Sequence, residues 1–195
     1  ARIGIRGNPA AAEEIGVARI LSLVRTTRCA VHLQPITSAR AVALLRAARA
    51  EGLPVTAAVA ARALVLDEEA LAGGSYDTRL RLHPPLRGAA DRAALVEAVR
   101  DGILLVCADH QPRAPEEKEL EFERAIPGST GLESAFAAAL TALGDLDLVV
   151  AAFSAGPRRL LPDAPAGWTL VDPFATAVVD PSTHHSMARN DALAG

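Results

Sequence analysis

The chain has 195 residues, a net charge of −3 and 50% hydrophobic residues, which suits one domain with a buried core. Phosphate binding needs clustered lysine and arginine, whereas this chain has a single lysine, Lys118, and scattered arginines, so we expect no nucleic-acid surface. No apolar run approaches the roughly 20 residues of a membrane span, and the first residues do not form a signal peptide. We therefore expect a cytoplasmic protein without membrane contact. Because the chain lacks an initiator methionine, we also expect it to begin within a longer protein.

The two cysteines, Cys29 and Cys107, each lie in an apolar run and not in a C-x-x-C pair. This placement predicts two buried thiols in a reducing compartment. A disulfide between neighbouring strands is the alternative.

Helical and strand-like patterns alternate along the chain. Apolar residues at helical spacing predict a helix over 10–26, a second that is capped by Thr37 or Ser38 and ends at Gly52, and a short third over 67–72. A fourth predicted helix is capped by Asp91. The fifth carries Leu132, Phe136, Leu140 and Leu143 before Gly144, and the sixth covers 147–155. Short apolar runs predict strands over 29–33, 55–59, 80–82 and 103–108, and a further strand over 168–172. Residues 73–75 are a predicted turn, and residues 111–130 a polar loop with a solvated surface from Glu116 to Glu123.

This alternation indicates an α/β fold with a parallel sheet and right-handed crossovers. No G-x-G-x-x-G follows a strand, which argues against a dinucleotide-binding fold. A (β/α)8 TIM-type barrel is the better match, but a closed barrel needs eight strands and about 250 residues. We therefore predict half of a barrel over 1–165 and the start of a small C-terminal β segment over 166–195. Since half a barrel has open edges, the other half is expected upstream or on a partner.

Chemistry in such barrels is found at the C-terminal ends of the strands. Asp109 directly follows the apolar run 103–108, and it could be a metal ligand or general base, or an aspartate that caps the next loop. His32, near the end of the first strand, could bind a metal or be hydrogen-bonded within the barrel. His83 could contact a ligand or be an ordinary loop residue. His184 and His185 are expected to be exposed.

Other catalytic patterns are missing from the sequence. It contains no G-x-S-x-G and no H-E-x-x-H, and the cysteines have no evident activating partner. A catalytic zinc needs about three protein ligands, of which Asp109 is the one evident here.

Several segments, in this order and spacing, resemble bacterial dihydroorotases of the amidohydrolase superfamily, from about residue 7 to residue 190. These segments are Gly7-Asn8-Pro9-Ala10-Ala11-Ala12-Glu13, residues 31–40 (VHLQPITSAR), residues 52–57 (GLPVTA), Pro84-Pro85-Leu86-Arg87, residues 108–112 (ADHQP) and residues 128–133 (GSTGLE). The resemblance implies the half of the barrel that follows its fourth strand, and zinc-dependent hydrolysis or closure of the dihydroorotate ring.

At the positions that the resemblance marks as functional, the chain departs from the family. Pro35 and Arg62 stand where the family has metal-binding histidines, and only Asp109 is kept. His83 and Arg113 replace a substrate-binding asparagine and histidine, and Gly128 is a further substrate position. A cation at Arg62 would repel zinc. The family's His-x-His ligand pair would lie upstream of this chain.

These departures resemble the non-catalytic dihydroorotase-like subunits that assemble with aspartate transcarbamoylase, an inference by analogy. The hypothesis is therefore a structural or regulatory partner in pyrimidine synthesis with a degenerate metal site and no cofactor, bound to aspartate transcarbamoylase or to another copy of itself. The alternatives are an active cyclic-amide hydrolase with a reduced zinc site, and a decayed remnant without a role.

Overall fold

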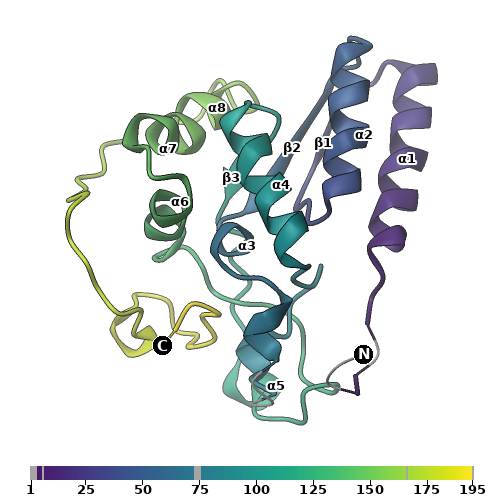
Figure 1. Cartoon of the computed structure of the whole chain (residues 1–195). Helices are drawn as coiled ribbons and strands as arrows, with labels where there is room; N and C mark the ends of the chain where they lie inside the picture. The colour runs from purple at the N-terminus through teal and green to yellow at the C-terminus, as the bar shows by residue number, and fades with distance from the viewer. Residues whose placement is uncertain (1–3, 6, 73–75, 166, 195) are drawn as a thin grey trace.

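The computed structural model describes residues 4–5, 7–72, 76–165 and 167–194. The α-helices are α1 (Ala10–Thr27), α2 (Ala39–Ala50), α3 (Arg62–Val65), α4 (Ala89–Arg100), α5 (Pro115–Lys118), α6 (Ala135–Leu143), α7 (Leu146–Phe153) and α8 (Ala155–Arg158), and the 3-10 helices are η1 (Glu68–Leu71), η2 (Thr78–Leu80) and η3 (Pro181–Thr183). The strands are β1 (Val31–Leu33), β2 (Val55–Ala60) and β3 (Leu105–Cys107). Figure 1 shows α1, α2 and α4 lying along the sheet. The predicted turn at 73–75 lies outside the described residues.

The sheet is parallel, as predicted, with the order β1-β2-β3. Val31 is paired with Val55, and Ala60 with Cys107. The strand predicted over 80–82 is wrong, because β2 pairs directly with β3 and residues 78–80 form η2. The Asp77 side chain accepts a hydrogen bond from the backbone N–H of Arg79 and so caps this short helical turn.

One face of the sheet packs against the helices. Alternating residues along β2, namely Val55, Ala57 and Val59, belong to the same buried core cluster as Leu45 of α2 and Leu95 of α4. The helix α2 begins as predicted, because the Ser38 hydroxyl accepts a hydrogen bond from Ala41 N–H at 3.2 Å.

Asp91 does not cap its own helix, contrary to the prediction. The N-cap of α4 is Gly88, and Asp91 lies in the first turn, where its carboxylate instead accepts a hydrogen bond from Ala39 N–H of α2 at 2.8 Å. The predicted start of the helix that carries Leu132 is also wrong, because α6 begins at Ala135 and leaves Leu132 67% exposed.

The Glu-rich segment is partly ordered rather than a fully solvated loop. It contains the single turn α5, and Lys118 and Phe122 are buried. Cys29 is exposed, against the prediction, because β1 begins two residues later, at Val31. Cys107 is partly buried, and both cysteines are free thiols.

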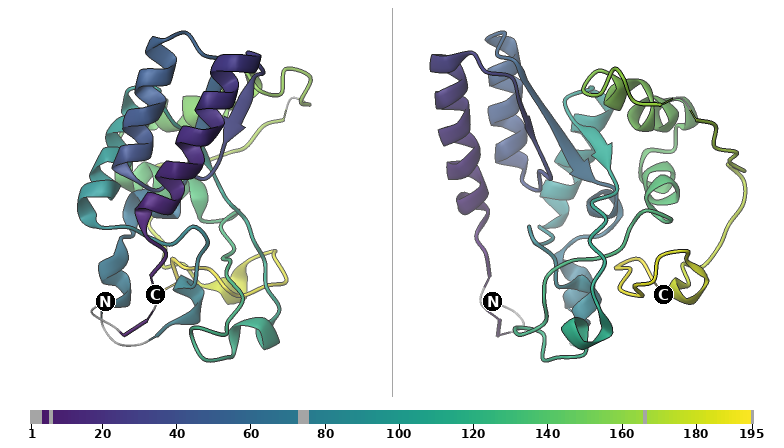
Figure 2. Two further views of the ribbon diagram at one scale, coloured as in Figure 1. Left: turned by 90° about the vertical axis from the view of Figure 1, so that its right-hand side faces the viewer. Right: turned by 180° about the vertical axis from the view of Figure 1, so that it is seen from behind.

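The C-terminal segment does not form the strand predicted over 168–172. Residues 168–172 have no strand partner among the described residues, and Trp168 and Leu170 are fully exposed. The chain then returns to the body of the protein, where Asp191 forms a parallel bridge with Thr130. Figure 2 shows this return from two further sides. The last described residues therefore close against the segment that precedes α6.

Candidate functional site

Three predicted positions follow the C-terminal ends of the three strands. Pro35 comes after β1, Arg62 after β2 and Asp109 after β3. Because the strands are parallel and adjacent, these ends meet at one edge of the sheet. This edge is the candidate site.

The structure joins Arg62 and Asp109 directly. The guanidinium Nη2 of Arg62 donates to the carboxylate Oδ2 of Asp109, and the two side chains are only 6% and 14% exposed. The Nη1 group donates to the carbonyls of Ala108 and Asp109, at 3.2 and 3.1 Å. The other Asp109 oxygen accepts a hydrogen bond from Gln111 Nε2 at 2.8 Å. Both carboxylate oxygens are therefore engaged by neighbouring side chains.

A glycine provides the space for this arrangement. A Cβ on Gly131 would lie 2.7 Å from the Ala108 carbonyl oxygen and 3.5 Å from Arg62 Nη1. The backbone N–H groups of Gly131 and Leu132 both donate to His110 Nδ1, at 3.3 and 3.2 Å. His110 thus holds the glycine segment against the end of β3.

The β1 end of the site offers no free metal ligand. His32 is hydrogen-bonded through Nδ1 to Thr56 Oγ1 at 2.9 Å and through Nε2 to Gln34 Oε1 at 3.0 Å. This confirms the alternative that His32 is hydrogen-bonded inside the fold. Pro35 has no side-chain atom that could coordinate a metal.

The positions that the resemblance assigned to substrate lie in two different places. His83 is exposed and lines a cavity of about 630 Å³ with Leu82 and Phe122. Arg113 lines a second cavity of about 580 Å³, and its Nε donates to Pro127 O at 2.8 Å. Arg113 lies over Gly128, where a Cβ would be 2.8 Å from that same Nε. The structure therefore brings Arg113 and Gly128 together, while His83 lines the other cavity.

Cys107 does not act as an activated thiol. Burial and, to a lesser extent, the negative charge of Asp109 raise its pKa to about 11. Its Sγ donates to Val59 O at 3.4 Å. A thiol in this state is protonated at neutral pH and is a poor nucleophile.

The donor set at this edge does not fit a zinc ion. Asp109 is paired with a cation, Pro35 has no donor atom, and Arg62 donates hydrogen bonds but cannot accept a metal. Within the ranges that the structure describes, no group of three or more His, Cys, Asp or Glu side chains is placed to hold a metal. No catalytic step through zinc can be built from these residues.

Two elements of the site were not predicted. Glu13, in the first turn of α1, accepts hydrogen bonds from the N–H groups of Thr37 and Ser38, at 3.0 and 3.1 Å, and lies 3.8 Å from Arg87 Nη2. His184 was expected to be exposed, but its side chain is 9% exposed and its Nδ1 lies 3.9 Å from Asp191 Oδ2. The Glu13 hydrogen bonds join residues 24 and 25 positions apart, so no local sequence pattern indicates them. The burial of His184 depends on the return of the C-terminal segment to Asp191 and was not evident from its polar neighbours.

The sequence is similar to curated dihydroorotases along its whole length. It is 35% identical to the dihydroorotase of Desulforapulum autotrophicum over 100% of this chain and 48% of the relative. It is 37% identical to that of Pelotomaculum thermopropionicum over 99% of the chain and 48% of the relative. The chain is a homologue of the dihydroorotases. It spans about half the length of these relatives.

Two solved hydantoinase structures have a fold similar to that of this chain. The D-hydantoinase (dihydropyrimidinase) from Thermus sp. superposes with a TM-score of 0.83 at 22% identity, over 96% of this chain and 45% of that chain. The L-hydantoinase (dihydropyrimidinase) from Arthrobacter aurescens gives 0.82 at 22% identity, over 94% and 45%. This chain therefore shares its parallel α/β fold with a little less than half of each of these two structures. No family model matches the sequence, and none of the helices in the described part of the chain has the length and apolarity to cross a membrane.

Proposed function

We propose that this chain is part of a dihydroorotase-like protein that does not hydrolyse dihydroorotate and acts as a structural or regulatory partner of aspartate transcarbamoylase in pyrimidine synthesis. The observation that carries this proposal is the buried ion pair between Arg62 and Asp109. The strand ends that form the site are in place, whereas Asp109, which this chain retains at a metal-binding position of the family, is ion-paired with Arg62.

Electrostatics support the loss of metal chemistry. A divalent cation at Asp109 would face the positive charge of Arg62 in a poorly solvated place, where repulsion between like charges is strongest. Zinc would therefore have to displace a buried arginine that also holds two backbone carbonyls.

The alternative is an active dihydroorotase or related cyclic-amide hydrolase with a reduced zinc site. The names of the relatives and the survival of Asp109 favour it. It requires Arg62 to leave Asp109 and other ligands to come from outside this chain.

The deciding experiment measures zinc content and dihydroorotate hydrolysis of the full-length protein, with the Pelotomaculum thermopropionicum dihydroorotase as the positive control. We expect neither stoichiometric zinc nor turnover, and the same for the variant Asp109→Asn. Stoichiometric zinc with turnover that Asp109→Asn abolishes would overturn the proposal in favour of the hydrolase.

The partner is tested separately. We expect the full-length protein to co-purify with aspartate transcarbamoylase when the two are co-expressed, and to change its activity or its oligomeric state. The exposed apolar side chains of Trp168, Leu170 and Phe174 support an assembly. A full-length protein that remains monomeric in the presence of the transcarbamoylase would contradict this part of the proposal.

A further inference from the structure

A cavity of about 580 Å³ lies between η2, α5 and the returning C-terminal segment. Four cationic side chains line it, Arg79, Arg113, Lys118 and Arg189. The lining contains two carboxylates, Asp77 and Glu119. In a chain whose net charge is −3, this is a local concentration of positive charge.

Only one of these cations is neutralised by an ion pair. Arg79 is bound to Asp77 through Nε and Nη2, with the Nη2 contact at 2.7 Å. Among the residues that the structure describes, no carboxylate lies within 4.0 Å of the charged groups of Arg113, Lys118 or Arg189. Glu119 lines the cavity and is exposed. Three positive charges around the cavity are therefore left without a direct counter-charge.

The polar contacts of these three side chains go to backbone carbonyls. Lys118 Nζ donates to Thr78 O, Ile126 O and Arg81 O, at 2.7, 3.0 and 3.3 Å. Arg113 Nε donates to Pro127 O at 2.8 Å, while Arg189 Nη1 donates to His184 O and Ser186 O, at 3.1 and 2.6 Å. These bonds hold the cationic groups in place but do not cancel their charge. In each arginine, other N–H groups remain for a ligand.

A buried amide fixes the wall between the two arginines. Asn190, 4% exposed, accepts a hydrogen bond from Arg113 N–H at 3.2 Å and donates to Gln111 O and Gly128 O, at 3.2 and 3.1 Å. Because Arg189 directly precedes Asn190, the same contacts position both cations. The cavity wall is thus preorganised, which reduces the entropic cost of binding.

We propose that this cavity binds a small molecule through an oxyanion group, a carboxylate or a phosphate, held by Arg113 and Arg189 beside Lys118. Planar guanidinium groups match the geometry of both oxyanions. The site requires no catalysis and goes beyond the proposed function, because it supplies a place where a metabolite could act on the assembly.

The charge state of Lys118 supports this reading. Its pKa is lowered to about 8, first by burial and then by the positive charges of Arg113 and Arg81, while Asp77 and Glu117 act in the opposite direction. An anion in the cavity stabilises the protonated amine. Binding near pH 8 should therefore be accompanied by proton uptake.

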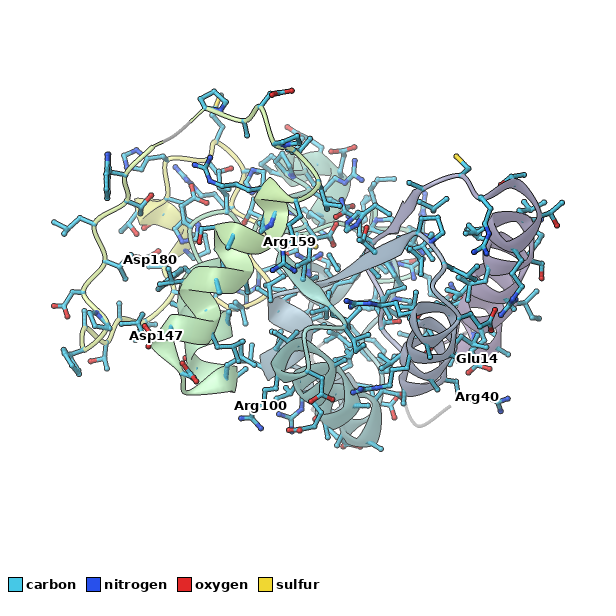
Figure 3. The ribbon with its side chains drawn as sticks, turned by 90° about the horizontal axis from the view of Figure 1, so that it is seen from above. Glu14, Arg40, Arg100, Asp147, Arg159 and Asp180 are labelled. Carbon is cyan, nitrogen blue, oxygen red and sulfur yellow. The ribbon has the colours of Figure 1, made fainter. Side chains whose placement is uncertain are left out.

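The test is isothermal titration calorimetry of the full-length protein with inorganic phosphate and, separately, with succinate. We expect saturable binding of at least one of them, and the comparison shows which oxyanion the site prefers. Arg113→Gln and Arg189→Gln should each weaken binding about tenfold or more, because a charge-assisted hydrogen bond is lost. The matched control is Arg159→Gln, an exposed arginine that follows α8 and is labelled in Figure 3.

Repeating the titration at pH 8 in buffers with different ionisation enthalpies should show net proton uptake. Because the Arg189 side chain is exposed, we expect Arg189→Gln to unfold at the same temperature as the wild type. A loss of anion binding by this variant then cannot be attributed to a loss of fold. If neither anion binds saturably, or if both cavity variants bind like Arg159→Gln, the inference is wrong. Either result leaves the zinc and hydrolysis measurements unaffected, so the two proposals fail separately.

Discussion

The guanidinium of Arg62 donates to the carboxylate of Asp109, and this contact joins the ends of two adjacent strands. Both side chains are almost fully buried. An ion pair in this position links the strand ends through charge and hydrogen bonds, as a shared metal would do. We conclude that the pair maintains the shape of the site without supplying its chemistry.

Arg62→Met should destabilise the protein by about 3–5 kcal/mol, because it leaves the buried carboxylate of Asp109 without its cation. Replacing both partners, as in Arg62→Met with Asp109→Leu, should recover part of the loss. The control is Arg46→Met, whose ion pair with Asp101 joins side chains that are 42% and 50% exposed, and which should cost no more than about 1 kcal/mol. Urea unfolding measures all three, and equal losses for Arg62→Met and Arg46→Met would contradict a structural role for the buried pair.

Gly131→Ala tests the close packing beside that pair. Its Cβ would lie 2.7 Å from the Ala108 carbonyl oxygen, so the backbone must shift, and we expect a loss of about 1–3 kcal/mol of unfolding free energy. Gly16→Ala in α1 is the control, because its Cβ meets nothing within 4 Å. That variant should stabilise the helix by about 0.5–1 kcal/mol. Thermal unfolding of the two variants should therefore shift in opposite directions, and a neutral Gly131→Ala would show that the strand ends can relax.

The placement of the site could be predicted from the sequence, because the ends of parallel strands meet at one edge. Pro35, Arg62 and Asp109 each follow an apolar strand, and the structure places them together. The ion pair itself was not predicted. The expectation that Arg62 repels a metal considered its charge alone and not the nearby carboxylate, which lies 47 residues away along the chain.

Predictions from the local sequence pattern were wrong where a capping hydrogen bond or a tertiary contact decides the structure. The apolar run at 80–82 resembles a strand, yet the Asp77 side chain caps a helical turn there instead. The apolar residues of 168–172 meet no partner strand in the described part of the chain, so no strand forms. Lys118 lies in a Glu-rich segment that suggests solvent, but backbone carbonyls surround its amine.

Glu13→Ala should weaken the attachment of α1 to the start of α2. The carboxylate accepts hydrogen bonds from two backbone N–H groups, of Thr37 and Ser38, and faces Arg87, whose side chain is only 9% exposed. Losing these partly buried contacts should cost about 1–3 kcal/mol.

The neighbouring residue provides the control for Glu13. Glu14 pairs with Arg40 at 3.3 Å, but the Arg40 side chain is 83% exposed, and both residues are labelled in Figure 3. Glu14→Ala should therefore change the unfolding free energy by no more than about 0.5 kcal/mol. Chemical denaturation of the two alanine variants should separate them clearly. If they are equally stable, Glu13 is not a structural link.

Lys118 gives the protein a pH dependence whose sign is opposite to that of an ordinary ion-paired lysine. Burial, and then the charge of Arg113, lowers its pKa in the folded protein to about 8, from its ordinary value of 10.5. Between these two values the unfolded chain binds more protons than the folded one, so the contribution of Lys118 to stability rises with pH. Below about pH 8 the amine is protonated in both states and its contribution no longer changes.

Lys118→Met isolates this effect, because it removes the titrating amine and leaves the neighbouring charges in place. It should be less stable than the wild type at pH 7, since three backbone carbonyls lose their donor. The stability difference between wild type and variant should then widen as the pH rises from 8 to 10. Urea unfolding at pH 7, 8, 9 and 10 measures it. A difference that narrows over this window would mean that the folded protein favours the charged amine, and the uncompensated positive charge argued for the cavity would have to be abandoned.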